Sequence, residues 1–197
     1  MKKLSEYQAI IVDLDGTLYY QQPVRMAMLV EMLLHFWRLP EFLIVWKYRK
    51  LYEQGLNEKQ RLALLPEKAP KIVHEWMIMR PLRHVERWRD GMLLDLLRAV
   101  QAAGVRVIVY SDYPVKEKLL ALDFVPDQAI SAGETGCLKP EGSGLLRILA
   151  LLGISPERSL VIGDRPEKDG KLAENIGAAC VILTNKNRSE LYRSVLY

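Results

Sequence analysis

Two carboxylates stand one residue apart at the end of an apolar run near the start of the chain. The run is "AIIVDL" at residues 9–14, and it is followed at once by Asp15. Because side chains alternate along a strand, the carboxylates of Asp13 and Asp15 lean to one side and Leu14 to the other. Two like charges at the edge of a core cost free energy unless a positive group joins them. The pattern predicts a site that holds a cation.

Other polar side chains follow later apolar runs in the same way. In an open α/β sheet the ligand site lies at the carboxyl ends of the strands, where the strand order reverses. We therefore expect these groups to meet Asp13 and Asp15 in one crevice, although they are far apart in the sequence. They are Ser111 and Asp112 after "VRVIVY", Lys139 in the loop "GETGCLKPEGSG", and Asp164 and Asp169 after "SLVIG".

The balance of charge in this crevice indicates a metal. Asp13, Asp15, Asp164 and Asp169 bring carboxylates, and Lys139 supplies one ammonium. A hard dication with oxygen ligands makes such a cluster tolerable, and Mg²⁺ suits a site that keeps waters and meets a substrate phosphate. The sequence therefore predicts Mg²⁺ as the cofactor.

The elements that position these residues alternate between strand and helix. Short apolar runs ended by turn residues are typical of strands that are covered on both faces, which implies a parallel sheet. Helical spacing of leucines separates the runs, and glycines end the helices. The pattern predicts a doubly wound, Rossmann-like α/β core. Strands are expected at residues 9–14, 105–112, 127–133, 159–164 and 179–183, and helices at 90–104, 114–122, 142–153 and 166–177.

A segment without strand signals interrupts this core. Residues 20–89 form an all-helical insertion, so the core comprises residues 1–19 and 90–197. Prolines mark breaks between helices because proline removes a backbone hydrogen bond and crowds the preceding turn. The expected helices are 24–39, 41–55, 57–65 and 69–80, with breaks at Pro40, Pro66 and Pro81.

Composition excludes several classes of protein. The chain has 197 residues, 50% of them hydrophobic, and a net charge of +4, so it can bury a sizeable core. Two cysteines, Cys137 and Cys180, suit a reduced, intracellular protein. A nucleic-acid partner is not indicated, because the sequence shows no dense run of Lys and Arg with interleaved aromatic residues. No signal peptide and no apolar run of membrane-spanning length are evident, so we expect a cytoplasmic protein. The sequence does not determine the oligomeric state.

Four segments resemble the motifs of the haloacid dehalogenase-like hydrolase superfamily. They are "DLDGTL" at 13–18, "VIVYSD" at 107–112, Lys139 with Pro140, and "GDRPEKD" at 163–169. Any one of them is a weak signal, but the four occur in the right order on both sides of the insertion. The resemblance implies that the insertion is the helical cap that such enzymes often carry between motifs one and two.

The resemblance also implies catalytic roles. Asp13 would be the nucleophile that forms an aspartyl-phosphate, and Asp15 the general acid and then the general base. Ser111 and Lys139 would bind the phosphoryl oxygens, and Asp112 belongs to the same phosphate-binding loop. Many capped relatives carry Asn at the position of Asp112, so this residue departs from the pattern.

The metal shell follows from the same resemblance. Asp13, Asp164 and the backbone carbonyl of Asp15 would hold Mg²⁺, and Asp169 would support that shell directly or through water. The family's dehalogenases lack the second Asp of motif one, so Asp15 favours phosphate over haloacid substrates.

Three functions remain open from the sequence. The first is a Mg²⁺-dependent phosphohydrolase that cleaves a small organic phosphate monoester. The second is a phosphotransferase or phosphomutase of the same fold, which would exclude water by closure of its cap. The third is a phospho-switch or interaction module without turnover, which would have no need of Asp15 or a large cap.

The insertion is rich in aromatic and basic residues, and three interpretations are open. These side chains could pack within the cap and leave a solvated positive face, or line a pocket that grips a second anionic group of the substrate. They could also touch a membrane surface, as basic amphipathic helices do. The residues are Phe36, Trp37, Arg38, Trp46, Lys47, Tyr48, Arg49, Lys50 and Trp76.

Overall fold

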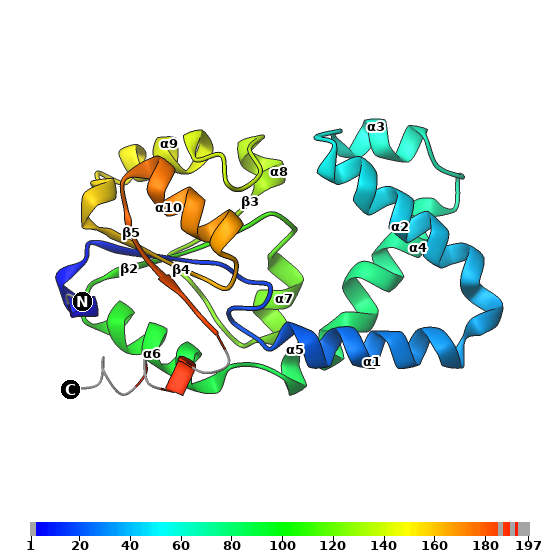
Figure 1. Ribbon diagram of the computed structural model, residues 1–197, viewed down its shortest axis with the longest axis horizontal. Coiled ribbons are helices and arrows are strands. Elements are labelled where there is room, and N and C mark those ends of the chain that lie inside the picture. Colours follow the sequence, from blue (N-terminus) through cyan, green and yellow to red (C-terminus); the bar gives the residue numbers. More distant parts are fainter. Residues whose placement is uncertain (1–2, 185–186, 190–191, 193–197) are drawn as a thin grey trace. The chain divides into compact units, whose positions relative to one another are not determined.

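The computed structural model describes residues 3–184, 187–189 and 192 (Figure 1). The chain divides into two compact units. The core unit comprises the residues up to Tyr20 together with those from Arg89 onward, and the helical unit comprises Gln21–Trp88.

A five-stranded parallel sheet forms the centre of the core unit. Its order is β3-β2-β1-β4-β5, so the strands progress in opposite directions on the two sides of β1. This confirms the predicted doubly wound sheet and places its switch point between β1 and β4. The strands are β1 (Ala9–Val12), β2 (Arg106–Ser111), β3 (Gln128–Ser131), β4 (Ser159–Gly163) and β5 (Ala179–Ile182).

Helices cover both faces of the sheet, which explains why β1 and β4 are buried at every position. Helices α9 and α10 pack on the face that carries Ile11, Ile108 and Val161. Helix α6 lies on the opposite side (Figure 1). The helices are α6 (Gly91–Ala102), α7 (Lys116–Ala121), α8 (Ala132–Thr135), α9 (Ser143–Leu151) and α10 (Lys171–Ile176), with short turns η1 (Leu4–Glu6), η4 (Pro156–Arg158) and the π-helix η5 (Pro166–Gly170).

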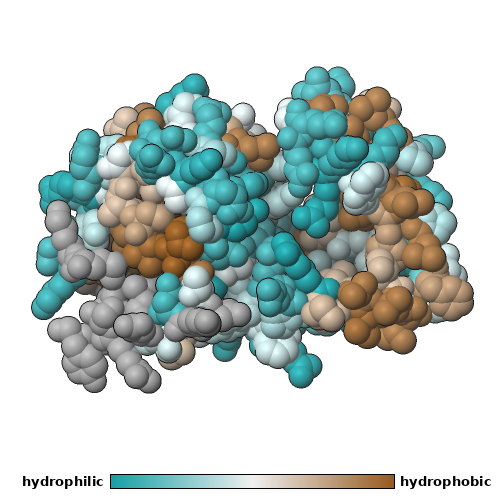
Figure 2. Space-filling view, in the orientation of Figure 1, coloured by the Kyte–Doolittle hydropathy of each residue, from teal (hydrophilic) through white to brown (hydrophobic). Residues whose placement is uncertain are grey.

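The helical unit contains only helices and turns among its residues. Figure 2 shows a hydrophobic surface over α1 and the start of α2. The elements are α1 (Gln21–Leu34), η2 (Phe36–Arg38), α2 (Leu39–Glu53), α3 (Glu58–Ala63), α4 (Ala69–His74), the π-helix η3 (Glu75–Met79) and α5 (Arg80–Arg87).

Two of the predicted proline breaks are wrong. Pro40 lies in the first turn of α2, where its missing N–H costs nothing, and the break comes earlier, at His35. Pro81 does not end a helix, because residues 69–87 are helical throughout. The N–H of Arg80 donates to the carbonyl of Glu75, and this wider π turn precedes the proline and relieves the crowding that its ring would cause in a regular α-helix.

Among the residues that the structure describes, no helix has the length and apolar character needed to span a bilayer.

Candidate active site

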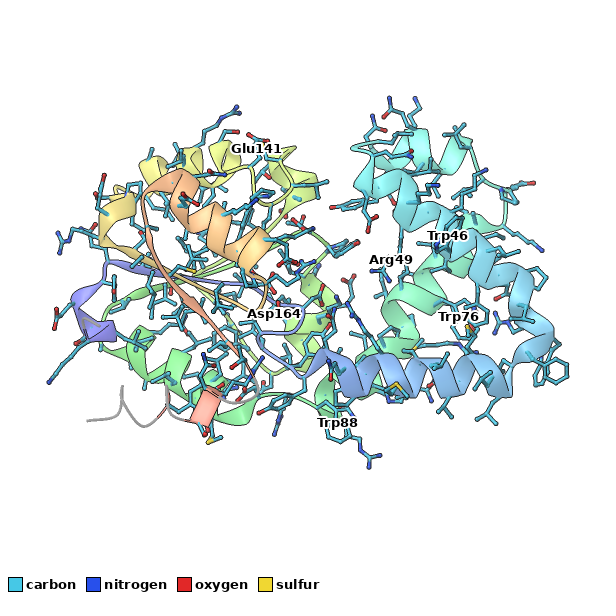
Figure 3. The ribbon with its side chains drawn as sticks, viewed as in Figure 1. Trp46, Arg49, Trp76, Trp88, Glu141 and Asp164 are labelled. Carbon is cyan, nitrogen blue, oxygen red and sulfur yellow. The ribbon has the colours of Figure 1, made fainter. Side chains whose placement is uncertain are left out.

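Three carboxylates come together at the carboxyl ends of the central strands. Asp13, Asp164 and Asp169 each offer an oxygen within 4.8 Å of the others. Asp13 follows β1 and Asp164 follows β4, the neighbouring strand, and the Asp13 N–H donates to the carbonyl of Ile162 at 2.9 Å. Figure 3 labels Asp164 in this part of the core unit. Adjacent parallel strands therefore place carboxylates that are about 150 residues apart in the sequence side by side.

Two glycines permit this close approach. Gly16 has a φ of +98°, and a Cβ built on it would lie 2.2 Å from Oδ2 of Asp164. A Cβ on Gly163 would lie 2.2 Å from Cγ of Asp169. A side chain at either glycine would collide with a carboxylate of the cluster. At Gly16 the left-handed backbone also favours glycine.

One lysine bridges two of the carboxylates. The Nζ atom of Lys139 donates to Oδ1 of Asp13 at 2.6 Å and to Oδ1 of Asp169 at 2.7 Å, and the lysine side chain is only 2% exposed. Burial lowers the pKa of Lys139, but the two carboxylates outweigh burial and hold it above its ordinary value. The ammonium is therefore a fixed positive charge in the cluster.

Asp13 and Asp15 have different surroundings although they are two residues apart. Burial raises the pKa of Asp13 to about 7, and Asp169 and Asp15 add to the rise while Lys139 opposes it. Burial also disfavours the charge on Asp15, but the Lys118 ammonium and the Tyr19 hydroxyl outweigh it, so the pKa of Asp15 lies below its ordinary value. The two carboxylates are thus tuned in opposite directions.

The partners of Asp15 come from residues that the sequence analysis did not single out. Lys118, on α7, places its Nζ atom 2.5 Å from Oδ1 of Asp15, and the hydroxyl of Tyr19 donates to the same oxygen. The side chain of Asp15 accordingly lies outside the three-carboxylate cluster. Tyr19 stands four residues after Asp15 and could have been found by its closeness. Lys118 carries no signal, because a lone lysine in an amphipathic helix resembles any surface charge.

Ser111 and Asp112 end β2 and are both buried. The Ser111 hydroxyl accepts the N–H of Tyr113 at 3.2 Å. Asp112 accepts the backbone N–H of Lys139 at 2.9 Å and binds Nζ of Lys168 at 2.5 Å. The negative charge of Asp112 is therefore offset by the ammonium of Lys168. The same carboxylate also holds the loop that carries Lys139. Its contact with phosphate stays a prediction.

The cluster fits a divalent cation. Its donors are all carboxylate oxygens, the set that Mg²⁺ prefers. Oδ1 of Asp164 is buried and has no hydrogen-bond partner among the residues that the structure describes. Burial and the neighbouring Asp169 raise the pKa of Asp164, while the charge of Arg165 opposes the rise. A cation beside this carboxylate would favour its ionised form. Asp13, Asp164 and Asp169 are thus the residues that could hold the ion.

The core unit is a doubly wound α/β sheet with an acidic cluster at the carboxyl ends of its central strands. Residues 7–177 match the family of haloacid dehalogenase-like hydrolases, and this match spans both units. The chain therefore belongs to that family, which confirms the resemblance drawn from the four motifs. No curated protein sequence matches the chain.

Solved structures agree with this fold. A hydrolase from Streptococcus pneumoniae is 21% identical with a TM-score of 0.64, and the match covers 98% of this chain and 100% of that one. A phosphatase of the same family from Thermococcus onnurineus is 20% identical with a TM-score of 0.64, covering 92% and 88%. The hydrolase YfnB from Bacillus subtilis, solved with magnesium, is 14% identical with a TM-score of 0.65, covering 98% and 100%.

Proposed function

We propose that the protein is a Mg²⁺-dependent phosphohydrolase that cleaves a small organic phosphate monoester through an aspartyl-phosphate on Asp13. One observation carries the proposal: two buried carboxylates two residues apart have separate lysine partners, Lys139 for Asp13 and Lys118 for Asp15. A nucleophile and an acid–base group need such different surroundings. The phosphatase from T. onnurineus and the magnesium in YfnB support the reaction class and the metal.

In the first step, an oxygen of Asp13 attacks phosphorus and the bond from phosphorus to the ester oxygen breaks. Asp15 gives its proton to the departing alkoxide. A general acid must carry a proton, but in the free protein the pKa of Asp15 lies below its ordinary value. The mechanism therefore requires the bound substrate dianion to raise the pKa of Asp15, since a nearby negative charge favours the protonated form. Lys139 and the Ser111 hydroxyl hold the phosphoryl oxygens.

In the second step, water attacks the phosphorus of phospho-Asp13, and Asp15 takes a proton from that water. The bond from phosphorus to the Asp13 oxygen breaks, which releases inorganic phosphate and leaves Asp13 ionised and Asp15 protonated, as they were before the first step. Asp13, Asp164 and Asp169, with the backbone carbonyl of Asp15, would hold Mg²⁺, which would supply positive charge for the phosphoryl oxygens and favour the ionised form of Asp13. We assign the helical unit, Gln21–Trp88, the role of the cap.

The test is hydrolysis of p-nitrophenyl phosphate with Mg²⁺ and with EDTA, followed by a panel of phosphorylated metabolites. We expect turnover that requires Mg²⁺ and falls by at least ~10³-fold in Asp13→Asn, because the amide cannot act as the nucleophile. Asp95→Asn is the matched control, since the side chain of Asp95 is 78% exposed on α6. A folded wild type that is inert on every ester, or full activity in Asp13→Asn, would refute the proposal. Transfer of the phosphoryl group to a sugar instead of water would identify a phosphotransferase.

A further inference from the structure

An apolar stripe runs along the exposed side of α1. Residues spaced by three and four positions share one face of a helix, and a helix normally buries such a stripe against a core. Here the stripe faces outward: Met26 is 59% exposed, Leu29 41%, Val30 51%, Leu33 63% and Leu34 64%. The helix thus presents to solvent the face that its periodicity marks for burial.

The stripe continues through the turn η2 and along α2. The exposed fractions are 65% for Phe36 and 64% for Trp37 in η2, then 51% for Leu39, 68% for Leu43 and 63% for Trp46. Leu39, Leu43 and Trp46 again follow helical spacing. We call this set the apolar face; it comprises Met26, Leu29, Val30, Leu33, Leu34, Phe36, Trp37, Leu39, Leu43 and Trp46. Figure 2 shows its hydrophobic surface over α1 and the start of α2. A continuous exposed apolar surface of this kind marks an interaction site.

The opposite sides of the same helices face ionic groups. Glu31 of α1 binds Arg80 at 3.0 Å and His84 at 2.8 Å. Glu41 of α2 binds Arg38 at 2.6 Å and accepts the indole N–H of Trp76 at 2.7 Å. The helical unit therefore pairs Glu31 and Glu41 inside, whereas ten large apolar side chains of the same segment stay exposed to solvent.

The segment that carries the apolar face, residues 21–52, has an excess of positive charge. Glu31 and Glu41 are the only acidic residues from position 21 to 52, and both are paired inside the unit. Residues 21–88 contain 12 Lys and Arg against 7 Asp and Glu, whereas the rest of the chain contains 16 against 17. The Lys50 ammonium lies 5.4 Å from the ring centre of Trp46, at the end of the apolar stripe on α2. The excess positive charge of the protein thus belongs to the unit that carries the apolar face.

We propose that the apolar face docks on the surface of a lipid bilayer that contains anionic lipids. Tryptophan and phenylalanine side chains insert at the headgroup boundary, and lysine and arginine attract acidic headgroups. The helices lie in the surface and do not cross the bilayer, in keeping with the absence of a spanning helix among the described residues. A second copy of the chain fits less well, because the face carries the Lys50 ammonium while Glu31 and Glu41, the acidic residues of positions 21–52, are paired inside the unit.

The experiment measures co-sedimentation of the full chain with vesicles of phosphatidylcholine alone and with vesicles that also contain phosphatidylglycerol. We expect the protein to bind the anionic vesicles at least ~10-fold more strongly and to lose that binding at high salt, because screening weakens the attraction. The emission of its tryptophans should shift to shorter wavelength on the anionic vesicles. The double variant Leu33→Glu with Trp37→Glu should lower binding at least ~10-fold.

The matched control is the double variant Val125→Glu with Leu151→Glu. Both residues are apolar and highly exposed, at 84% and 86%, but they belong to the core unit. This control adds the same charge and should bind as the wild type does; far-UV circular dichroism and thermal unfolding verify that both variants fold. No binding to either vesicle, equal binding to both, or equal losses in the two variants would overturn the proposal. A dimer that forms without lipid and dissociates in Leu33→Glu would also overturn the proposal, because it would show that a second copy of the chain covers the face. None of these readouts depends on phosphatase activity.

Discussion

Lys139 and Asp13 are 126 residues apart in the chain, and the Nζ atom of the lysine lies 2.6 Å from Oδ1 of the aspartate. Both side chains are 2% exposed, and the same ammonium also binds Asp169. A charge that is buried this deeply has no access to water as an alternative partner. A metal ion bound to this cluster would therefore share a task with the lysine, since each would offset the charge of the same carboxylates.

Lys139→Met separates these tasks. Removing the ammonium leaves buried carboxylates without a partner, so we expect the free energy of unfolding in EDTA to fall by about 3–5 kcal/mol. Saturating Mg²⁺ should restore more stability to the variant than it adds to the wild type, because the ion then supplies the missing positive charge. Urea unfolding with and without Mg²⁺ measures both effects. An unchanged midpoint in EDTA would show that Lys139 does not stabilise the cluster.

Gly16→Ala should weaken Mg²⁺ binding. The added methyl group would occupy the place of the Asp164 carboxylate, and the φ of +98° strains any residue with a Cβ. We expect the concentration of Mg²⁺ needed for half-maximal binding, measured by calorimetry, to rise at least ~10-fold.

Gly104→Ala is the control for the backbone strain. Gly104 has a φ of +88°, and nothing lies within 4 Å of a Cβ built there. We expect it to lose about 1 kcal/mol of stability and to bind Mg²⁺ as the wild type does. Equal binding of Mg²⁺ by the two alanine variants would mean that Asp164 does not need the space beside Gly16.

Arg188 ties the segment after the last strand to the loop that follows Asp15. Its guanidinium donates to the carbonyls of Gly16 and Thr17 and to Oδ2 of Asp90. Arg188→Ala leaves the buried carboxylate of Asp90 without its arginine, although the hydroxyl of Tyr192 and the backbone N–H of Leu93 still donate to it. We expect a loss of about 3–5 kcal/mol in the free energy of unfolding, measured in urea.

Arg98→Ala is the comparison for this variant. Arg98 is 43% exposed, pairs with Asp95 on the same helix and donates to the carbonyl of Asp123, so its removal should cost only about 0.5–1 kcal/mol because these contacts are open to water. If Arg188→Ala costs as little as Arg98→Ala, the buried contacts of Arg188 are not stabilising.

Much of the core could be predicted because its signals are local. β-branched runs ended by polar residues fix the strands, and the parallel topology then gathers their carboxyl ends. For that reason Asp13, Asp164 and Asp169 were placed together from the sequence, and the structure brings them within reach of one ion. The assignment of roles to these residues remains a prediction.

The residues that sequence reasoning missed act through tertiary contacts. Lys118 and Arg188 reach their carboxylates only after the chain has folded, and nothing in their spacing separates them from surface charges. The helix through Pro81 was missed because a π turn depends on the packing of its neighbours. The sequence analysis predicted the helices of the insertion but not the exposed stripe on α1, because helical spacing does not specify what covers an apolar face.

The ion pairs inside the helical unit predict a pH dependence. Hydrogen bonds from Arg38, and then from Arg80, lower the pKa of Glu75 to about 2, although partial burial opposes them. In the unfolded chain the same group titrates near its ordinary value of 4.5. Because the folded pKa is the lower one, Glu75 stabilises the fold above pH 4.5, and this contribution is lost as the pH falls toward 2.

Glu75→Gln isolates that contribution. The variant should be less stable than the wild type at neutral pH, and the difference should shrink steadily between pH 4.5 and 2, because the wild-type carboxylate is protonated there. Urea unfolding of both proteins over this range measures the difference, and Glu53→Gln, an exposed residue at the end of α2, provides the comparison. A difference that stays constant with pH would mean that the charge of Glu75 does not stabilise the helical unit, and that its contacts with Arg38 and Arg80 act only as neutral hydrogen bonds.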